Sequence, residues 1–225
     1  MLDGRWRAKA EHSLEPVGRA LHLAGISADL LTVLGLLASI GTAVLIANGN
    51  LALSVIGLVL TGLPDILDGS VARHSGTAGV RGAFFDSVCD RVADAVLLGG
   101  VAWHLTDKGP EAPVLVLAVV ALTMLVSYER AKAEALGLSA RGGVMERLER
   151  LVLLGAGLAF DVLVPMLWVM LVLTAITAVH RFVMVWRQAT PAESKPSRAN
   201  RRRPATRAHA RRSRPRVLSR VQGRR

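Results

Sequence analysis

Four aspartates interrupt an otherwise apolar stretch of this chain, Asp65 and Asp68 in the run DILDGSVAR and Asp86 and Asp90 in the run GAFFDSVCD. An ionised carboxylate near the middle of a bilayer costs about 2.5 to 3.5 kcal/mol on insertion scales. Several such groups in one apolar region therefore require a cation, an ion-pair partner or a water-filled cavity. We expect positive charge to bind there.

The spacing of these acids predicts that they share a site. Asp65 and Asp68 are three residues apart and Asp86 and Asp90 four apart, so each pair lies on one face of a helix. Two facing helices then present four carboxylates to one cavity. Hard oxygen ligands without His or Cys favour Mg²⁺, with Mn²⁺ as the alternative, and such ions also take phosphate oxygens as ligands. The pattern predicts a divalent-metal site.

The elements that must position this site are membrane helices. The chain has 225 residues, 52% of them hydrophobic, which favours an integral membrane protein over a soluble one. Only helices and closed barrels satisfy the backbone in lipid, so we expect an all-α fold with six transmembrane helices. The apolar segments cover roughly 30–48, 51–73, 83–104, 112–135, 147–162 and 164–186. The fifth is short and is interrupted by Gly155 and Gly157.

Basic residues predict the orientation of these segments. Lys and Arg gather in the loops near residues 77 and 140, whereas the loops near 49, 107 and 163 hold only Lys108. The positive-inside rule therefore places the acidic site and both termini in the cytoplasm of a cell-membrane protein. Before the first span, apolar residues recur three and four apart, which predicts a juxtamembrane amphipathic helix on the cytoplasmic surface, in a segment covering residues 1–28.

The C-terminal segment has a different composition from the rest. Residues 187–225 contain fourteen Lys and Arg and a single acid, Glu193. Such a segment buries too little apolar surface to fold, so we expect a disordered basic tail after a catalytic transmembrane domain at 29–186. The tail has neither interleaved aromatic residues nor a folded module, so we expect it to meet anionic lipid headgroups rather than nucleic acid.

The acidic pattern resembles a known signature. All eight positions of the CDP-alcohol phosphotransferase motif are matched, as Asp65-x-x-Asp68-Gly69-x-x-Ala72-Arg73 and then Gly82-x-x-x-Asp86-x-x-x-Asp90. The resemblance covers residues 26–186 and implies a six-helix membrane fold, a cytoplasmic-facing site and usually a homodimer.

The resemblance also implies a reaction. An acceptor hydroxyl attacks the phosphorus that bears the alcohol group of a CDP-alcohol, and CMP leaves. The four aspartates would hold one or two divalent cations, and Asp90 would also be the catalytic base. The implied CDP-diacylglycerol site consists of Asp29, Leu30, Leu31, Thr32, Gly69, Arg73 and Gly79.

Two further segments, SYERAKAE and ERLERL, resemble the actinobacterial phosphatidylinositol phosphate synthases of that family. In that group a basic pocket beside the metal site binds the phosphate of the acceptor, and the matching residues are Arg130, Arg150 and Arg181. The resemblance implies phospholipid biosynthesis: transfer of the phosphatidyl group of CDP-diacylglycerol to inositol 1-phosphate (1D-myo-inositol 3-phosphate), giving phosphatidylinositol phosphate.

Other interpretations stay open at this point. The acceptor can instead be glycerol 3-phosphate, as in a phosphatidylglycerophosphate synthase, and a cation carrier or a silent lipid-binding scaffold needs no transfer at all. The aspartates can form a structural ion-pair network with Arg73 and Arg91, and positive-inside bias alone explains the basic loop. For Asp94, one turn beyond Asp90, local pairing or a place at the cavity mouth is the preferred interpretation.

Overall fold

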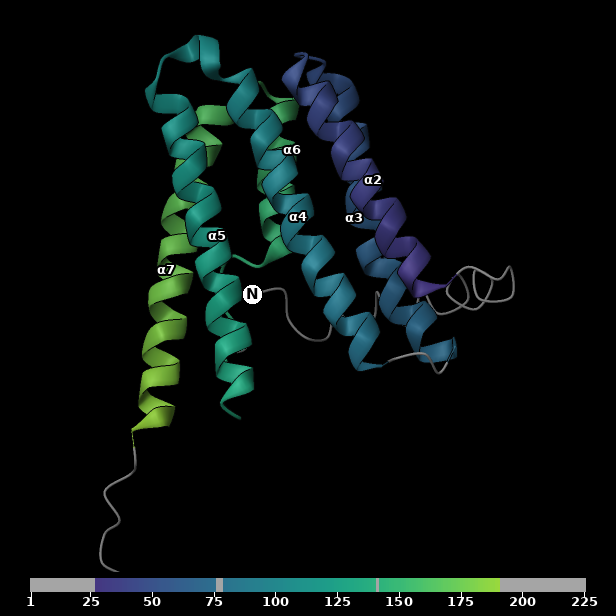
Figure 1. Cartoon of the computed structure of the whole chain (residues 1–225). Helices are drawn as coiled ribbons and strands as arrows, with labels where there is room; N and C mark the ends of the chain where they lie inside the picture. Colours follow the sequence, from purple (N-terminus) through teal and green to yellow (C-terminus); the bar gives the residue numbers. More distant parts are fainter. Residues whose placement is uncertain (1–26, 76–78, 141, 191–225) are drawn as a thin grey trace, which may run out of the picture. The chain divides into compact units, whose positions relative to one another are not determined.

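The computed structural model of the chain describes residues 27–75, 79–140 and 142–190, with side chains in the first range described up to residue 63. Within these ranges the chain is helical and contains no strand, which confirms the predicted all-α class. The elements, drawn in Figure 1, are α2 (Ala28–Ala47), α3 (Leu51–Ser75), α4 (Val80–His104), the 3-10 helix η1 (Thr106–Lys108), α5 (Glu111–Ala135), α6 (Arg147–Ala159) and α7 (Leu163–Ala189). The expected amphipathic helix and nearly all of the expected tail lie outside the described residues.

Three of the helices indicate a membrane protein. α2, α5 and α7 are long and apolar enough to cross a bilayer, and the first half of α3, Leu51–Leu63, is a shorter apolar stretch. α4 carries the acidic residues and their neighbouring arginines, so it is less apolar than those three. α6 has 13 residues, about 20 Å at 1.5 Å per residue, which is shorter than a bilayer core.

Small residues allow α2 to pack closely against both α3 and α4. A Cβ placed on Gly100 of α4 would lie 2.5 Å from the carbonyl oxygen of Ala43, and one placed on Gly57 of α3 would lie 2.4 Å from the hydroxyl of Thr42. In lipid, helix association depends on such close approach because apolar burial from water contributes little. α2 is therefore the helix that fixes the spacing of the two acid-bearing helices.

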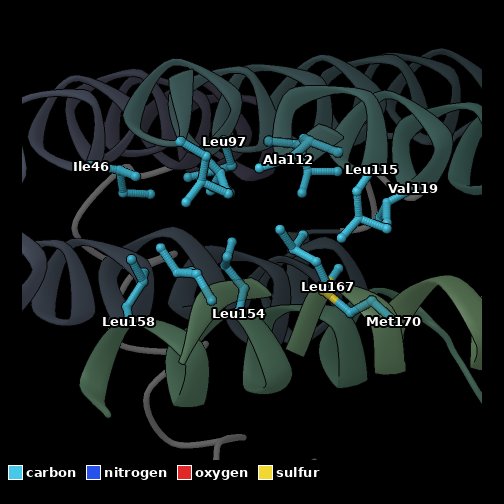
Figure 2. Packing of buried hydrophobic residues seen from close by; sticks show 14 of the residues in the cluster. Ile46, Leu97, Ala112, Leu115, Val119, Leu154, Leu158, Leu167 and Met170 are labelled. Carbon is cyan, nitrogen blue, oxygen red and sulfur yellow. The ribbon is translucent and has the colours of Figure 1, made fainter. Parts of the chain in front are cut away.

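The apolar core joins α4 and α5 to α6 and α7. Figure 2 shows Leu97 lying opposite Leu154, and Leu115 and Val119 on the side facing Leu167 and Met170. All of these side chains belong to one buried cluster. From α4 and α6 the cluster takes Leu97, Leu98, Val101, Leu151, Leu154 and Leu158. The acidic residues of α4 all precede the part of the helix that enters the cluster.

The linker between α5 and α6 runs back along α7 instead of continuing as a helix. Gln188 donates to the carbonyl oxygen of Ser139 at 2.6 Å, and Arg181 donates to that of Gly142 at 2.9 Å. Thr177 accepts from the backbone N–H groups of Val144 and Met145 at 3.2 and 3.1 Å. These hydrogen bonds satisfy backbone groups that have no partner within a helix. The linker therefore explains why α6 is so short.

Candidate functional site

Three aspartates follow one another along a single face of α4. Asp86 and Asp90 are half-buried, and Asp94, one turn further, is buried. Their spacing of four residues stacks them on consecutive turns. Asp65 and Asp68 belong to α3, but their side chains lie outside the described part of the chain. Half of the predicted metal set is therefore visible, and it lies on one face as predicted.

Two arginines of α6 pair with this acidic face. A guanidinium nitrogen of Arg147, Nη1, contacts Oδ1 of Asp90, and its Nε lies 3.5 Å from Oδ1 of Asp94. Arg150 donates from Nη2 to Oδ2 of Asp94 at 2.6 Å. We call Asp90, Arg147, Asp94 and Arg150 the ion-pair ladder. Alternating charges reduce the cost of burying each one.

The ladder joins two helices whose backbones are not in close contact. No Cα atom of α4 lies within 8 Å of a Cα atom of α6 in the described ranges, so the two helices meet through their side chains alone. Long arginine side chains span this separation, and the aspartates of α4 provide the opposite charge. The ladder thus places charged groups of both signs next to one another between the two helices.

A capping box fixes the first turn of α6. The side chain of Glu146 accepts from the backbone of Glu149, and Glu149 accepts from the backbone N–H of Glu146 at 3.1 Å. This reciprocal pair sets the start of the helix. Arg147 and Arg150, three residues apart, then project from one face toward α4. The sequence ERLER, residues 146–150, therefore determines both where α6 begins and that its two arginines point toward α4.

The acidic residues fit a divalent ion of the hard, oxygen-preferring type. Asp86 and Asp90 offer carboxylate oxygens on one half-buried face, a donor set that favours Mg²⁺ or Mn²⁺ over softer metals. The described side chains include no cluster of three or more potential ligands, and the predicted set needs Asp65 and Asp68 to complete it. The predicted metal role of the four aspartates stays a prediction.

The structural alternative pairs the aspartates with Arg73 and Arg91; the side chain of Arg73 lies outside the described part, and Arg91 donates to the carbonyl oxygen of Ser87 in its own helix. The cation at Asp90 comes instead from Arg147. For Asp94 the preferred interpretation was local pairing or a place at the cavity mouth, and the structure shows it paired with the two arginines of α6. Neither Arg147 nor Arg150 was predicted as its partner.

The predicted nucleotide residues at the start of α2 lie beside the start of α4. A Cβ added to Gly82 would come within 3.7 Å of Oδ1 of Asp29, so Asp29 reaches the turn that precedes Asp86. Gly79 is the N-cap of α4 and provides no side-chain cap, which leaves the first N–H groups of that helix to other acceptors.

The remaining members of that set differ in exposure. Leu30 is exposed, whereas Leu31 is buried in the helix packing, and the hydroxyl of Thr32 donates to the carbonyl oxygen of Ala28. Leu31 therefore offers little side-chain surface to a ligand, and its predicted place in the nucleotide site stays a prediction. Gly69 and Arg73 are in α3 beyond the described side chains.

The three predicted acceptor arginines come from three helices and have three different environments. Arg130 of α5 is exposed and pairs with Glu134 at 3.1 Å. Arg150 is buried in the ladder. Arg181 of α7 is buried at 3% exposure and lies within electrostatic range of both other arginines. The shared acceptor-phosphate role of these three arginines stays a prediction.

Arg181 is engaged mainly with the backbone. Its Nε donates to Gly142 and its Nη1 to the carbonyl oxygen of Val126 at 3.0 Å, while Nη2 lies 3.9 Å from Oε1 of Glu146. Carbonyl oxygens thus supply much of the negative potential that a buried guanidinium requires. Thr177, one turn earlier on the same face of α7, is the residue that sequence reasoning missed. Its spacing of four from Arg181 is the signal that could have revealed it.

Comparison with known proteins identifies relatives of this chain. The family model described as CDP-alcohol phosphatidyltransferase matches residues 26–189. A phosphatidylinositol phosphate synthase of Mycobacterium tuberculosis is 34% identical over 192 residues, covering 80% of this chain and 88% of the relative. One of Streptomyces avermitilis is 34% identical over 210 residues, covering 86% of each chain.

The solved structures that resemble this chain include those of a synthase with the same name as these relatives. A crystal structure of the Mycobacterium tuberculosis phosphatidylinositol phosphate synthase with CDP-DAG bound has a TM-score of 0.70 at 32% identity, covering 76% of this chain and 92% of the other. A second structure of that synthase, in complex with manganese and citrate, has a TM-score of 0.69 at 32% identity and covers 76% and 88%.

Proposed function

Because the chain belongs to the CDP-alcohol phosphatidyltransferase family, we propose that it transfers the phosphatidyl group of CDP-diacylglycerol to inositol 1-phosphate and releases CMP. The relatives at 34% identity are named phosphatidylinositol phosphate synthases, which supports this acceptor. The observation that carries the proposal is the ion-pair ladder, since it joins the motif acid Asp90 to the arginine Arg150 through a continuous chain of opposite charges.

In the proposed reaction an oxygen of the acceptor attacks the phosphorus that bears the diacylglycerol group. The bond from this phosphorus to the CMP oxygen breaks, CMP leaves, and the proton of the acceptor hydroxyl passes to a carboxylate oxygen of Asp90. Asp90 accepts this proton because of its position beside the acceptor site, in the way of a general base. Arg150, and Arg130 and Arg181 around it, would neutralise the acceptor's own phosphate.

A divalent cation would neutralise the pyrophosphate and stabilise the departing oxygen when bound by Asp65, Asp68, Asp86 and Asp90. The donor type supports Mg²⁺ or Mn²⁺, and the relative solved with manganese is consistent with either. The residues that would hold CDP-diacylglycerol are Asp29, Leu30, Leu31, Thr32, Gly69, Arg73 and Gly79.

We also propose the arrangement of the protein in the membrane. The three long apolar helices support a multi-pass protein, and six crossings by α2 to α7 are the proposed topology. The distribution of Lys and Arg supports a cytoplasmic site, cytoplasmic termini and the cell membrane as location. The segments 1–28, 29–186 and 187–225 would then be the membrane-surface helix, the catalytic domain and the basic tail. The family resemblance supports a homodimer.

The test is CMP release by the purified full-length protein in lipid vesicles that contain CDP-diacylglycerol. With inositol 1-phosphate and Mg²⁺ we expect release, and chelation of the metal should abolish it. Glycerol 3-phosphate in competition measures the choice of acceptor, and free inositol measures the need for the phosphate. Preference for glycerol 3-phosphate would reassign the acceptor. No release with any phosphorylated or free polyol would contradict the transferase itself, and ion uptake under those conditions would favour a carrier.

A further inference from the structure

Asp94 lies outside the eight matched motif positions, yet its environment is unusual. Among the described residues it is the only acidic side chain that is buried, at 7% exposure. A buried carboxylate is retained only where it has close partners of opposite charge. Its position in the middle of α4, one turn beyond Asp90, places it between the predicted metal face and the apolar core.

The two oxygens of Asp94 serve two different arginines. Oδ2 accepts from Nη2 of Arg150 at 2.6 Å, and Oδ1 lies 3.5 Å from Nε of Arg147. The carboxylate thus holds two guanidinium groups that would otherwise repel each other. Arg181, a third cation within electrostatic range of Arg150, adds to that repulsion. Without Asp94 we expect Arg150 to move away from α4.

We propose that Asp94 is a positioning residue for the acceptor site, which holds Arg150 and Arg147 in place so that a phosphorylated acceptor meets fixed cations beside Asp90. This inference rests on the proposed function, because it names how the acceptor phosphate is recognised. Charges that are already oriented bind an anion without first reorganising, and this advantage depends on the groups that support them.

A purely structural role makes a different prediction from a positioning role. If Asp94 only stabilised the helix packing, its loss would lower the amount of folded enzyme and leave both Michaelis constants unchanged. If it positions Arg150, its loss raises the KM for the phosphorylated acceptor and leaves the KM for CDP-diacylglycerol alone. The separation of the two constants therefore distinguishes the roles.

The experiment measures both constants for Asp94→Asn in vesicles, with Asp107→Asn as the matched control because Asp107 is exposed in η1. We expect the KM for inositol 1-phosphate to rise by about tenfold and the KM for CDP-diacylglycerol to change by less than about twofold. Asp94→Glu keeps the charge but displaces it by one methylene, so we expect a smaller rise. If the Asn variant does not fold, the Glu variant alone must still raise the acceptor constant selectively.

A double variant tests the route through Arg150. In an Arg150→Ala background, Asp94→Asn should add less than about twofold to the acceptor constant, because the side chain that it positions is absent. Full additivity, or an unchanged acceptor constant in a folded Asp94 variant, would overturn the inference while leaving the proposed transferase intact. A wild-type protein that releases no CMP with any phosphorylated acceptor would overturn the proposed function first, and this inference with it.

Discussion

The two halves of the surface between α4 and α6 are held together in opposite ways. Toward the N-terminus of each helix the contacts are ionic, made by Asp90, Asp94 and the two arginines of the ladder. Toward the C-terminus they are apolar, with Leu97 of α4 opposite Leu154 of α6 (Figure 2). The apolar half consists of hydrophobic side chains. The ionic half contains charged side chains that close packing alone would not require. The difference agrees with the proposed division, in which the ionic half takes part in the reaction and the apolar half supports it.

The largest expected effect is the loss of activity from the ionic half. Asp90→Asn removes the proposed proton acceptor, and we expect CMP release to fall by about 10³-fold. Asp90 also pairs with Arg147, so we expect some loss of thermal stability as well, and CMP release is compared per amount of folded protein. Release within about tenfold of wild type would break the assignment of Asp90 as base.

Shortening a side chain in the apolar half should lower the stability of the protein and leave its specific activity unchanged. Leu154→Ala opens a cavity in the buried cluster, and we expect a loss of about 2 to 3 kcal/mol in the free energy of unfolding. The specific activity of the folded fraction should be retained. Val152→Ala is the matched control, since that side chain lies on the same helix with 63% exposure. Equal losses in the two variants would contradict the packing role of the cluster.

The other face of α4 provides a test of backbone contact with α2. Gly100→Ala places a Cβ 2.5 Å from the carbonyl oxygen of Ala43, so we expect about 1 to 3 kcal/mol of destabilisation. At the neighbouring Gly99 an added Cβ meets nothing within 4 Å, and Gly99→Ala should be neutral or stabilising by up to about 1 kcal/mol. Thermal unfolding of the two variants under the same conditions measures the contrast.

The smallest expected effect concerns the support of α6 from α7. Thr177→Val leaves the N–H groups of Val144 and Met145 without their acceptor, and we expect a loss of about 1 to 2 kcal/mol. Thr174→Val, one turn earlier, is the control because the hydroxyl of Thr174 is buried with no hydrogen-bond partner in the described part of the chain. Removing that hydroxyl should be neutral or stabilising, and a greater loss there than at Thr177 would contradict the support role.

Much of the fold could be predicted because apolar runs and glycine-containing breaks determine membrane helices locally. The acidic face of α4 follows from the spacing of Asp86 and Asp90, and the family followed from the motif. The partners of charged groups could not be predicted in the same way. Asp94 and Arg150 are 56 positions apart, and their pairing depends on how α6 is placed.

The short fifth segment was visible in the sequence, but the environment of Arg181 was hidden for the same reason as the ladder pairs. A charged residue in an apolar helix shows that a partner is needed but not which one. Arg181 was predicted to bind phosphate, and in the structure two of its nitrogens donate to backbone carbonyl oxygens of other segments. Its contact with an acceptor stays a prediction.

Hydrogen bonds from side chains of α7 fix the linker before α6 at Ser139, at Gly142 and at Val144 and Met145. A change in its length therefore cannot be absorbed within the linker. One extra residue between Met145 and Arg147 would rotate the following helix by about 100° relative to this anchorage. Both arginines would then turn away from α4 while every helix stayed intact. The length of a short irregular segment therefore governs whether two charged surfaces face each other.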